Sequence, residues 1–171
     1  MKKITGLSPR HERIIQKTWA SSRSVFILSL ITFITVVFAF VAVVVREATL
    51  AAEGDFLTLV GEVGTLAISF LAVTVFRKIL NMPRPYEFIT VPGWNKEKQK
   101  NGEGFPSRHV FSAFVIATVL FPWNMWISIA LYAFGIAMAV CRVLLGMHFI
   151  KDVVAGAIIG IASGVIGLLI I

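Results

Sequence analysis

The chain has 171 residues, of which 57% are hydrophobic and only 15% are charged, and its formal net charge is +7. A soluble domain of this length cannot bury so much apolar surface, so the composition excludes a soluble globular protein and indicates one that lies in a bilayer. In a soluble protein the positive charge would suggest nucleic acid as a partner, but no nucleic-acid motif is present, and basic loops beside membrane spans explain the charge more simply.

Residues 1–23 form a basic head before the first apolar run. They hold six of the sixteen basic residues and one acid, Glu12. The placing of Ile14, Ile15 and Trp19 favours an amphipathic helix on the membrane surface, and a disordered basic tail is an equally good interpretation. Because 23 mostly polar residues precede an apolar run longer than the core of a usual signal peptide, we expect an uncleaved anchor.

Five apolar stretches follow the head. They are residues 24–45, 56–76, 110 to about 121, about 124–141, and 153–171. The first has 22 uncharged residues, and a helix of that length reaches roughly 33 Å, enough to cross the hydrocarbon core. The third and fourth come from 32 uncharged residues, too many for one helix, which Pro122 and Trp123 divide into a short span, a hairpin and a second span. The sequence therefore predicts one all-α domain over residues 1–171, an integral membrane bundle of about five transmembrane helices with an N-terminal amphipathic segment.

Glu62 is the one acid inside the second predicted span. Carboxylates within a membrane are costly enough to be functional candidates. However, Glu62 lies about two turns from the start of its span, at the end opposite the polar clusters described below. We therefore favour a structural role for Glu62, either protonated or hydrogen-bonded, over a functional one.

Three glycines follow Asp152 at four-residue steps in the fifth span, at Gly156, Gly160 and Gly164. Small residues at this spacing let a neighbouring helix approach closely. The neighbour is either a helix of the same bundle or a helix of another chain, so the oligomeric state stays open.

Three polar clusters interrupt the apolar sequence. They are Arg84-Pro85, Pro106-Ser107-Arg108-His109, and Arg142 with His148 and Asp152. With five spans, the second span ends, the third begins, the fourth ends and the fifth begins at one face of the membrane, so we expect the clusters to form a single site. The connection over residues 78–108 is rich in proline and glycine, which predicts an ordered irregular cap with a short helix.

The residue types in these clusters suit cleavage of a phosphate ester without a metal, which needs a nucleophile, an acid–base group and cations. His148 and Asp152 are four residues apart, so on a helix the carboxylate is expected to accept the imidazole Nδ1–H and leave the Nε2 lone pair free. No metal site is indicated, because the third histidine, His11, lies in the head and Cys141 is the only cysteine. We therefore predict an enzyme without metal or cofactor.

These motifs resemble those of the type 2 phosphatidic acid phosphatase family, integral membrane lipid phosphatases whose site is shared by vanadium haloperoxidases and some soluble acid phosphatases. The family pattern, K-x6-R-P, P-S-G-H and S-R-x5-H-x3-D, is matched in order and spacing over about residues 77–156. Arg77 replaces the lysine, with Lys78 beside it as an alternative cation, and Cys141 replaces the serine. Arg108 replaces the glycine, and so adds a clamp for a second phosphate or biases the choice of substrate.

The resemblance implies a role for each matched residue. His148 Nε2 attacks phosphorus and forms a phosphohistidine, Asp152 fixes the tautomer of His148, and His109 protonates the leaving alkoxide and then activates water. The phosphate-binding residues implied are Arg77, Lys78, Arg84, Ser107, Arg108 and Arg142.

A site at the mouth of a helix bundle suits a lipid whose tail stays in the bilayer while its phosphate enters a cationic pocket. We expect a metal-independent phosphatase acting on phosphatidic acid, phosphatidylglycerol phosphate or a polyprenyl diphosphate, with Arg108 favouring a diphosphate. A lipid phosphotransferase is one alternative. A non-catalytic membrane protein that binds anionic lipid through the same arginines is another.

Basic residues are distributed unevenly along the chain. The head has six and residues 77–151 have nine, whereas the predicted loop over residues 46–55 has only Arg46. The positive-inside rule therefore predicts a cell-membrane protein with its N-terminus and its active site on the cytoplasmic face. The resemblance points the other way, because many relatives with six spans work on the outer face.

Overall fold

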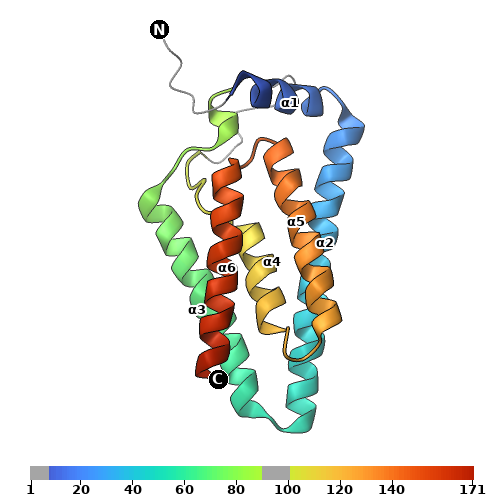
Figure 1. Cartoon of the computed structure of the whole chain (residues 1–171), viewed down its shortest axis with the longest axis vertical. Coiled ribbons are helices and arrows are strands. Elements are labelled where there is room, and N and C mark those ends of the chain that lie inside the picture. The colour runs from blue at the N-terminus through green and yellow to red at the C-terminus, as the bar shows by residue number, and fades with distance from the viewer. Residues whose placement is uncertain (1–7, 90–100) are drawn as a thin grey trace.

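The computed structural model describes residues 8–89 and 101–171, and every regular element in these two ranges is a helix. The elements are α1 (Pro9–Trp19), α2 (Ser22–Glu53), α3 (Phe56–Leu80), the 3-10 helix η1 (Pro85–Glu87), α4 (Arg108–Val119), α5 (Met125–Leu144) and α6 (Ile150–Ile170). The long helices run alongside one another, and α1 lies across one end of the bundle (Figure 1). The predicted all-α membrane bundle is confirmed.

Four of the helices, α2, α3, α5 and α6, are long and apolar enough to cross a membrane. The predicted third span corresponds to α4, whose 12 residues reach only about 18 Å, too short to cross the hydrocarbon core by itself. Helix α4 tolerates this length because α2, α3, α5 and α6 all contact it. It is therefore the central helix of the bundle, and most of its side chains are buried.

The expected loop over residues 46–55 is wrong, because α2 continues as a helix to Glu53. Arg46 does not end the helix, since its guanidinium pairs with Glu62 on α3 at 2.9 Å and both side chains are largely buried. The chain turns at Gly54, which has a positive φ of 76°. The preferred structural role of Glu62 is therefore borne out in its hydrogen-bonded form.

The predicted hairpin between the third and fourth spans is present. Helix α4 ends at Val119, and α5 begins after Asn124, whose side-chain oxygen accepts hydrogen bonds from the backbone N–H groups of Trp126 and Ile127. An asparagine in this position caps the first turn of a helix. The cap explains why the uncharged stretch divides where it does.

The glycines of α6 pack against α4 within the same chain. A Cβ atom on Gly156 would lie 2.8 Å from the Ser107 carbonyl oxygen, and one on Gly160 would lie 2.7 Å from the Phe111 carbonyl oxygen. At the top of this contact the Ser107 N–H donates to the Asp152 carbonyl at 2.9 Å. The close approach of the two backbones thus places the N-termini of α4 and α6 side by side.

The described part of the head, residues 8–23, forms helix α1 and the start of α2 and not a disordered tail. Ile15 is fully buried and packs against Ile89. Trp19 Nε1 donates to the Leu145 carbonyl at 3.2 Å. Helix α1 therefore rests on the turn between α5 and α6, at the same end of the bundle as the N-termini of α4 and α6 (Figure 1).

We predict that Gly160→Ala lowers the Tm of the protein in detergent, because the added methyl group meets the backbone of α4 and overpacking costs about 1–3 kcal/mol. Gly64→Ala is the matched control, since Gly64 is also helical and a Cβ atom there has nothing within 4 Å. The control should keep or raise the Tm, because alanine favours helices more than glycine. Equal Tm values for the two variants would contradict this tight contact.

Candidate active site

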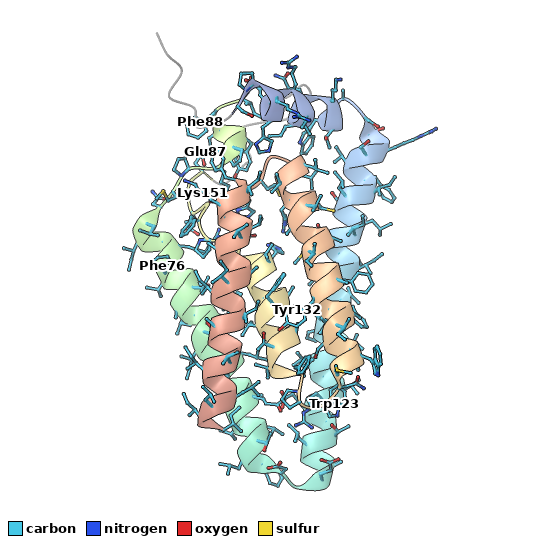
Figure 2. All side chains as sticks on the ribbon, in the orientation of Figure 1. Phe76, Glu87, Phe88, Trp123, Tyr132 and Lys151 are labelled. Carbon is cyan, nitrogen blue, oxygen red and sulfur yellow. The ribbon has the colours of Figure 1, made fainter. Side chains whose placement is uncertain are left out.

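Four segments of the chain meet at the end of the bundle that α1 covers. They are the last turn of α3, the segment over residues 101–107, the first turn of α4 and the turn between α5 and α6. Figure 2 marks this end with the labels of Glu87 and Lys151, far from Trp123 at the opposite end. The sequence clusters are therefore brought together, as expected from five spans.

His148 is held by a partner that the sequence did not identify. Its Nδ1 lies 2.8 Å from the Gly104 carbonyl oxygen, whereas Asp152 Oδ2 is 3.7 Å away, beyond hydrogen-bond length. Asp152 Oδ2 accepts instead from the Phe149 backbone N–H at 2.8 Å. The expectation that Asp152 accepts the Nδ1–H is thus corrected. Because a carbonyl can only accept, Nδ1 still carries the proton and the lone pair still lies on Nε2.

Gly104 can present this carbonyl because it has no side chain. Its N–H donates to the Met82 carbonyl at 2.6 Å, and a Cβ atom would lie 2.8 Å from the Pro83 carbonyl oxygen. A larger residue would push the segment away from Met82 and Pro83 and so displace the carbonyl that His148 contacts. The sequence signal was a pair of glycines, Gly102 and Gly104, which alone indicates only a loop.

Glu87 is a second residue that the sequence analysis missed. Its Oε1 accepts from the backbone N–H groups of Arg84 and Gly102, both at 2.8 Å. Glu87 thus links the segment that follows α3 to the segment that precedes α4. Tyr86 lies beside Glu87 in η1, and its backbone N–H donates to the Gly146 carbonyl at 3.1 Å. Gly146 is two residues before His148 in the sequence. The spacing of Arg84 and Glu87 was the available signal, since a glutamate at the third helical position commonly bonds back to the cap.

Two of the predicted phosphate-binding arginines also shape this loop. Arg77 is only 2% exposed, and its guanidinium donates to the carbonyls of Pro106 and Glu103. Arg84 Nε donates to the Gly102 carbonyl at 3.0 Å. Lys78, the alternative cation, is exposed and lies one residue further round α3, so the helix directs Arg77 and not Lys78 toward the loop.

Three of the predicted phosphate-binding residues have a buried donor with no hydrogen-bond partner among the described residues. The donors are Ser107 Oγ, Arg77 Nε and Arg142 Nε. The Arg142 guanidinium otherwise contacts Met147, with Nη1 2.8 Å from a thioether sulfur, which is a weak acceptor. Leaving buried donors unpaired costs free energy, so this convergence is typical of a site that binds an oxyanion.

His109 joins the polar end of the site to an apolar cavity. The charges of Arg142, His148, Arg108 and Arg77 all act on its imidazole. His109 and Arg108 also line a cavity of about 690 Å³, whose other walls are mostly apolar side chains of α2, α3 and α4. The site therefore has a cationic end at His148 and an apolar extension among the helices.

Burial lowers the pKa of His148 below its ordinary value, and the positive charges of Arg84 and Arg142 lower it as well. Asp152 acts in the opposite direction, because its negative charge favours the imidazolium. The balance keeps His148 neutral, as a nucleophilic nitrogen must be.

Comparison with known proteins shows similarity over most of the chain. Residues 58–171 match the model of the PAP2 superfamily. The crystal structure of Aquifex aeolicus LpxE is similar, with a TM-score of 0.65 and 24% identity over 97% of this chain and 98% of that chain. A second similar structure is the first transmembrane PAP2 type phosphatidylglycerolphosphate phosphatase from Bacillus subtilis, with a TM-score of 0.67 and 18% identity over 94% of this chain and 84% of that chain. Both likenesses show the fold.

We predict that His148 titrates below the ordinary histidine value in the detergent-solubilised protein, as measured by NMR of ¹⁵N-histidine. His11→Gln and His109→Gln assign the three histidine signals. Because Asp152 raises the pKa of His148, Asp152→Asn should lower it further. An ordinary or raised pKa for His148 would contradict the buried neutral imidazole, and an upward shift in Asp152→Asn would contradict the role of the carboxylate.

Proposed function

Because the chain belongs to the PAP2 superfamily, we propose that it is a membrane lipid phosphatase that hydrolyses a phosphomonoester or diphosphate through a phosphohistidine, without a metal. The observation that carries this proposal is the His148 imidazole, fixed through Nδ1 by the Gly104 carbonyl among unpaired buried donors. This leaves Nε2 as a neutral nucleophile near Arg84 and Arg142, whose charges act on His148.

In the first step, His148 Nε2 attacks phosphorus in line while the bond to the ester oxygen breaks. The electron pair moves to that oxygen, which takes a proton from the His109 imidazolium. A bound phosphate favours protonated His109, because its negative charge offsets the positive field of the surrounding arginines. Asp152, 3.7 Å from Nδ1, stabilises the positive charge that develops on His148.

In the second step, neutral His109 removes a proton from water, and the water oxygen attacks the phosphorus of the phosphohistidine. The N–P bond breaks and inorganic phosphate leaves. Arg77, Arg84 and Arg142 stabilise the phosphoryl oxygens, over which charge is spread in the transition state. Ser107 Oγ and the backbone N–H groups at the start of α4 add donors at a helix N-terminus, where anions bind well.

A lipid substrate is supported by the apolar cavity beside His109. Its walls suit a hydrocarbon chain, and its polar end adjoins the site. The candidates are phosphatidic acid, phosphatidylglycerol phosphate, which the similar Bacillus subtilis protein is named for, and a polyprenyl diphosphate.

We predict phosphate release by the detergent-purified protein, with chelator present, from at least one of these lipids. His148→Ala should lower kcat by about a thousandfold or more, because the nucleophile is lost. Asp152→Asn should lower kcat by only about 10- to 100-fold, since the Gly104 carbonyl still fixes the tautomer of His148. Full activity of His148→Ala would refute the mechanism, and transfer of phosphate to an alcohol in place of release would indicate a phosphotransferase.

The distribution of charge supports a proposal for the side of the membrane on which the site lies. We propose that the site faces the cytoplasm, because α1 and the site occupy one end of the bundle, and every lysine and arginine of the described residues except Arg46 lies toward that end. At the opposite end Arg46 pairs with Glu62. The positive-inside rule favours the cytoplasm for the end with more lysines and arginines.

Single cysteines in a Cys141→Ser background test this orientation in intact cells with a membrane-impermeant maleimide. The Lys96, Lys98 and Lys100 positions of the loop lie outside the described residues, so Asn101→Cys, exposed beside the site, is the better probe. Glu53→Cys, exposed at the opposite end, is its control. We expect Glu53→Cys to react and Asn101→Cys to react only after lysis, and the reverse pattern would place the site outside.

A further inference from the structure

Arg108 lies where the site meets the apolar cavity. It lies in the first turn of α4, beside His109, and lines the cavity with it. Its Cζ is 6.0 Å from the centroid of the Phe70 ring on α3, and its charge acts on Arg77 and His109. His148 does not line the cavity, whereas His109 and Arg108 both do.

Arg108 also differs from the other arginines of the site in its contacts. Arg77, Arg84 and Arg142 each donate hydrogen bonds to neighbouring groups. Within residues 8–89 and 101–171, no acceptor takes a hydrogen bond from the Arg108 guanidinium, which rests only on the face of Phe70. A half-buried cation beside apolar walls loses hydration, and an anionic ligand compensates that loss best.

We propose that Arg108 binds a second anionic group of the substrate, directly on the tail side of the reacting phosphate, and thereby makes the enzyme prefer lipid diphosphates. This inference rests on the proposed function. The terminal phosphate then lies at His148, the inner phosphate at Arg108 and the hydrocarbon chain in the cavity. In phosphatidic acid, the position next to the reacting phosphate holds an uncharged glycerol ester, which offers Arg108 only neutral acceptors.

The reaction on a diphosphate gives Arg108 a role in the transition state as well as in binding. His148 Nε2 attacks the terminal phosphorus, and the bond from that phosphorus to the bridging oxygen breaks. The electron pair stays on the bridging oxygen, so the leaving group is the lipid monophosphate with an added negative charge. Water then releases inorganic phosphate from His148. Arg108 stabilises the growing charge, so its loss should lower kcat and raise KM for a diphosphate.

The test compares farnesyl diphosphate with farnesyl phosphate, which share one tail, as substrates of the full-length protein in detergent. The measured quantity is the ratio of kcat/KM for the diphosphate to kcat/KM for the monophosphate. Arg108→Gln should reduce this ratio about 10- to 100-fold, the usual effect of losing a hydrogen bond to a charged group. Arg108→Gly should reduce this ratio to a similar extent. Arg108→Lys should reduce it less, because a cation remains.

Lys151→Gln is the matched control. Lys151 is an exposed cation on α6 that also rests on an aromatic ring, 5.5 Å from the centroid of Phe149, but it does not line the cavity. Its loss removes the same charge from the same end of the protein and should leave the ratio unchanged. An unchanged ratio in Arg108→Gln, or an equal fall in Lys151→Gln, would overturn the proposal. A Tm close to that of wild type shows that each variant is folded.

A binding measurement separates this proposal from the proposed function. Farnesyl methylenebisphosphonate and farnesyl phosphonate resist hydrolysis, so their Kd values do not depend on turnover. Wild type should bind the bisphosphonate more tightly, and Arg108→Gln should lose about 10- to 100-fold of that advantage. If no lipid is hydrolysed but this loss is seen, the phosphatase assignment fails and the Arg108 site stands. If phosphate is released but the two ligands bind alike, the Arg108 proposal fails and the phosphatase assignment stands.

Discussion

The close packing of α6 on α4 is the constraint on which the rest of the site depends. Glycines at the contact let the two backbones approach until the Ser107 N–H reaches the Asp152 carbonyl at 2.9 Å. This bond sets the start of α4 beside the start of α6, and so places His109 near His148. The loop that enters α4 then passes close enough for the Gly104 carbonyl to hold the imidazole. A short, fully surrounded α4 is therefore a requirement of the site and not an incomplete span.

Positive charge determines what the site formed by α4, α6 and the adjoining loop can bind. The guanidinium groups of Arg77, Arg84, Arg108 and Arg142 converge at this end, where Asp152 accepts a hydrogen bond from the backbone and Glu87 holds the loop together. These cations repel one another, and a bound anion relieves the repulsion. The same arginines that hold the segment over residues 101–107 therefore also favour phosphate binding. The apolar cavity beside His109 extends the pocket toward a hydrocarbon chain. Together these features make a lipid phosphate a better fit than a soluble one.

Much of the fold and part of the site could be predicted from sequence, because the relevant signals are local. Apolar run lengths gave the helices, the glycine spacing gave the face of α6 that packs inward, and the motif spacing brought His109, His148 and Asp152 together. Contacts between distant segments could not be predicted in this way. Arg46 stays within α2 only because Glu62 on α3 pairs with it, and Gly104 replaces Asp152 as the partner of Nδ1 only because the loop folds against α3. Nothing local to Glu62 or Gly104 specifies those partners.

The central claim is that His148 carries the phosphoryl group during turnover. The most direct measurement is peptide mass spectrometry after alkaline quenching of the protein with its substrate, since phosphohistidine survives alkali. With a substrate whose leaving group needs no proton, His109→Gln should increase the trapped amount, because the adduct still forms but the water is not activated. The account predicts one added phosphoryl group on the peptide that contains His148. Phosphate release with no such adduct, or an adduct on another residue, would contradict it.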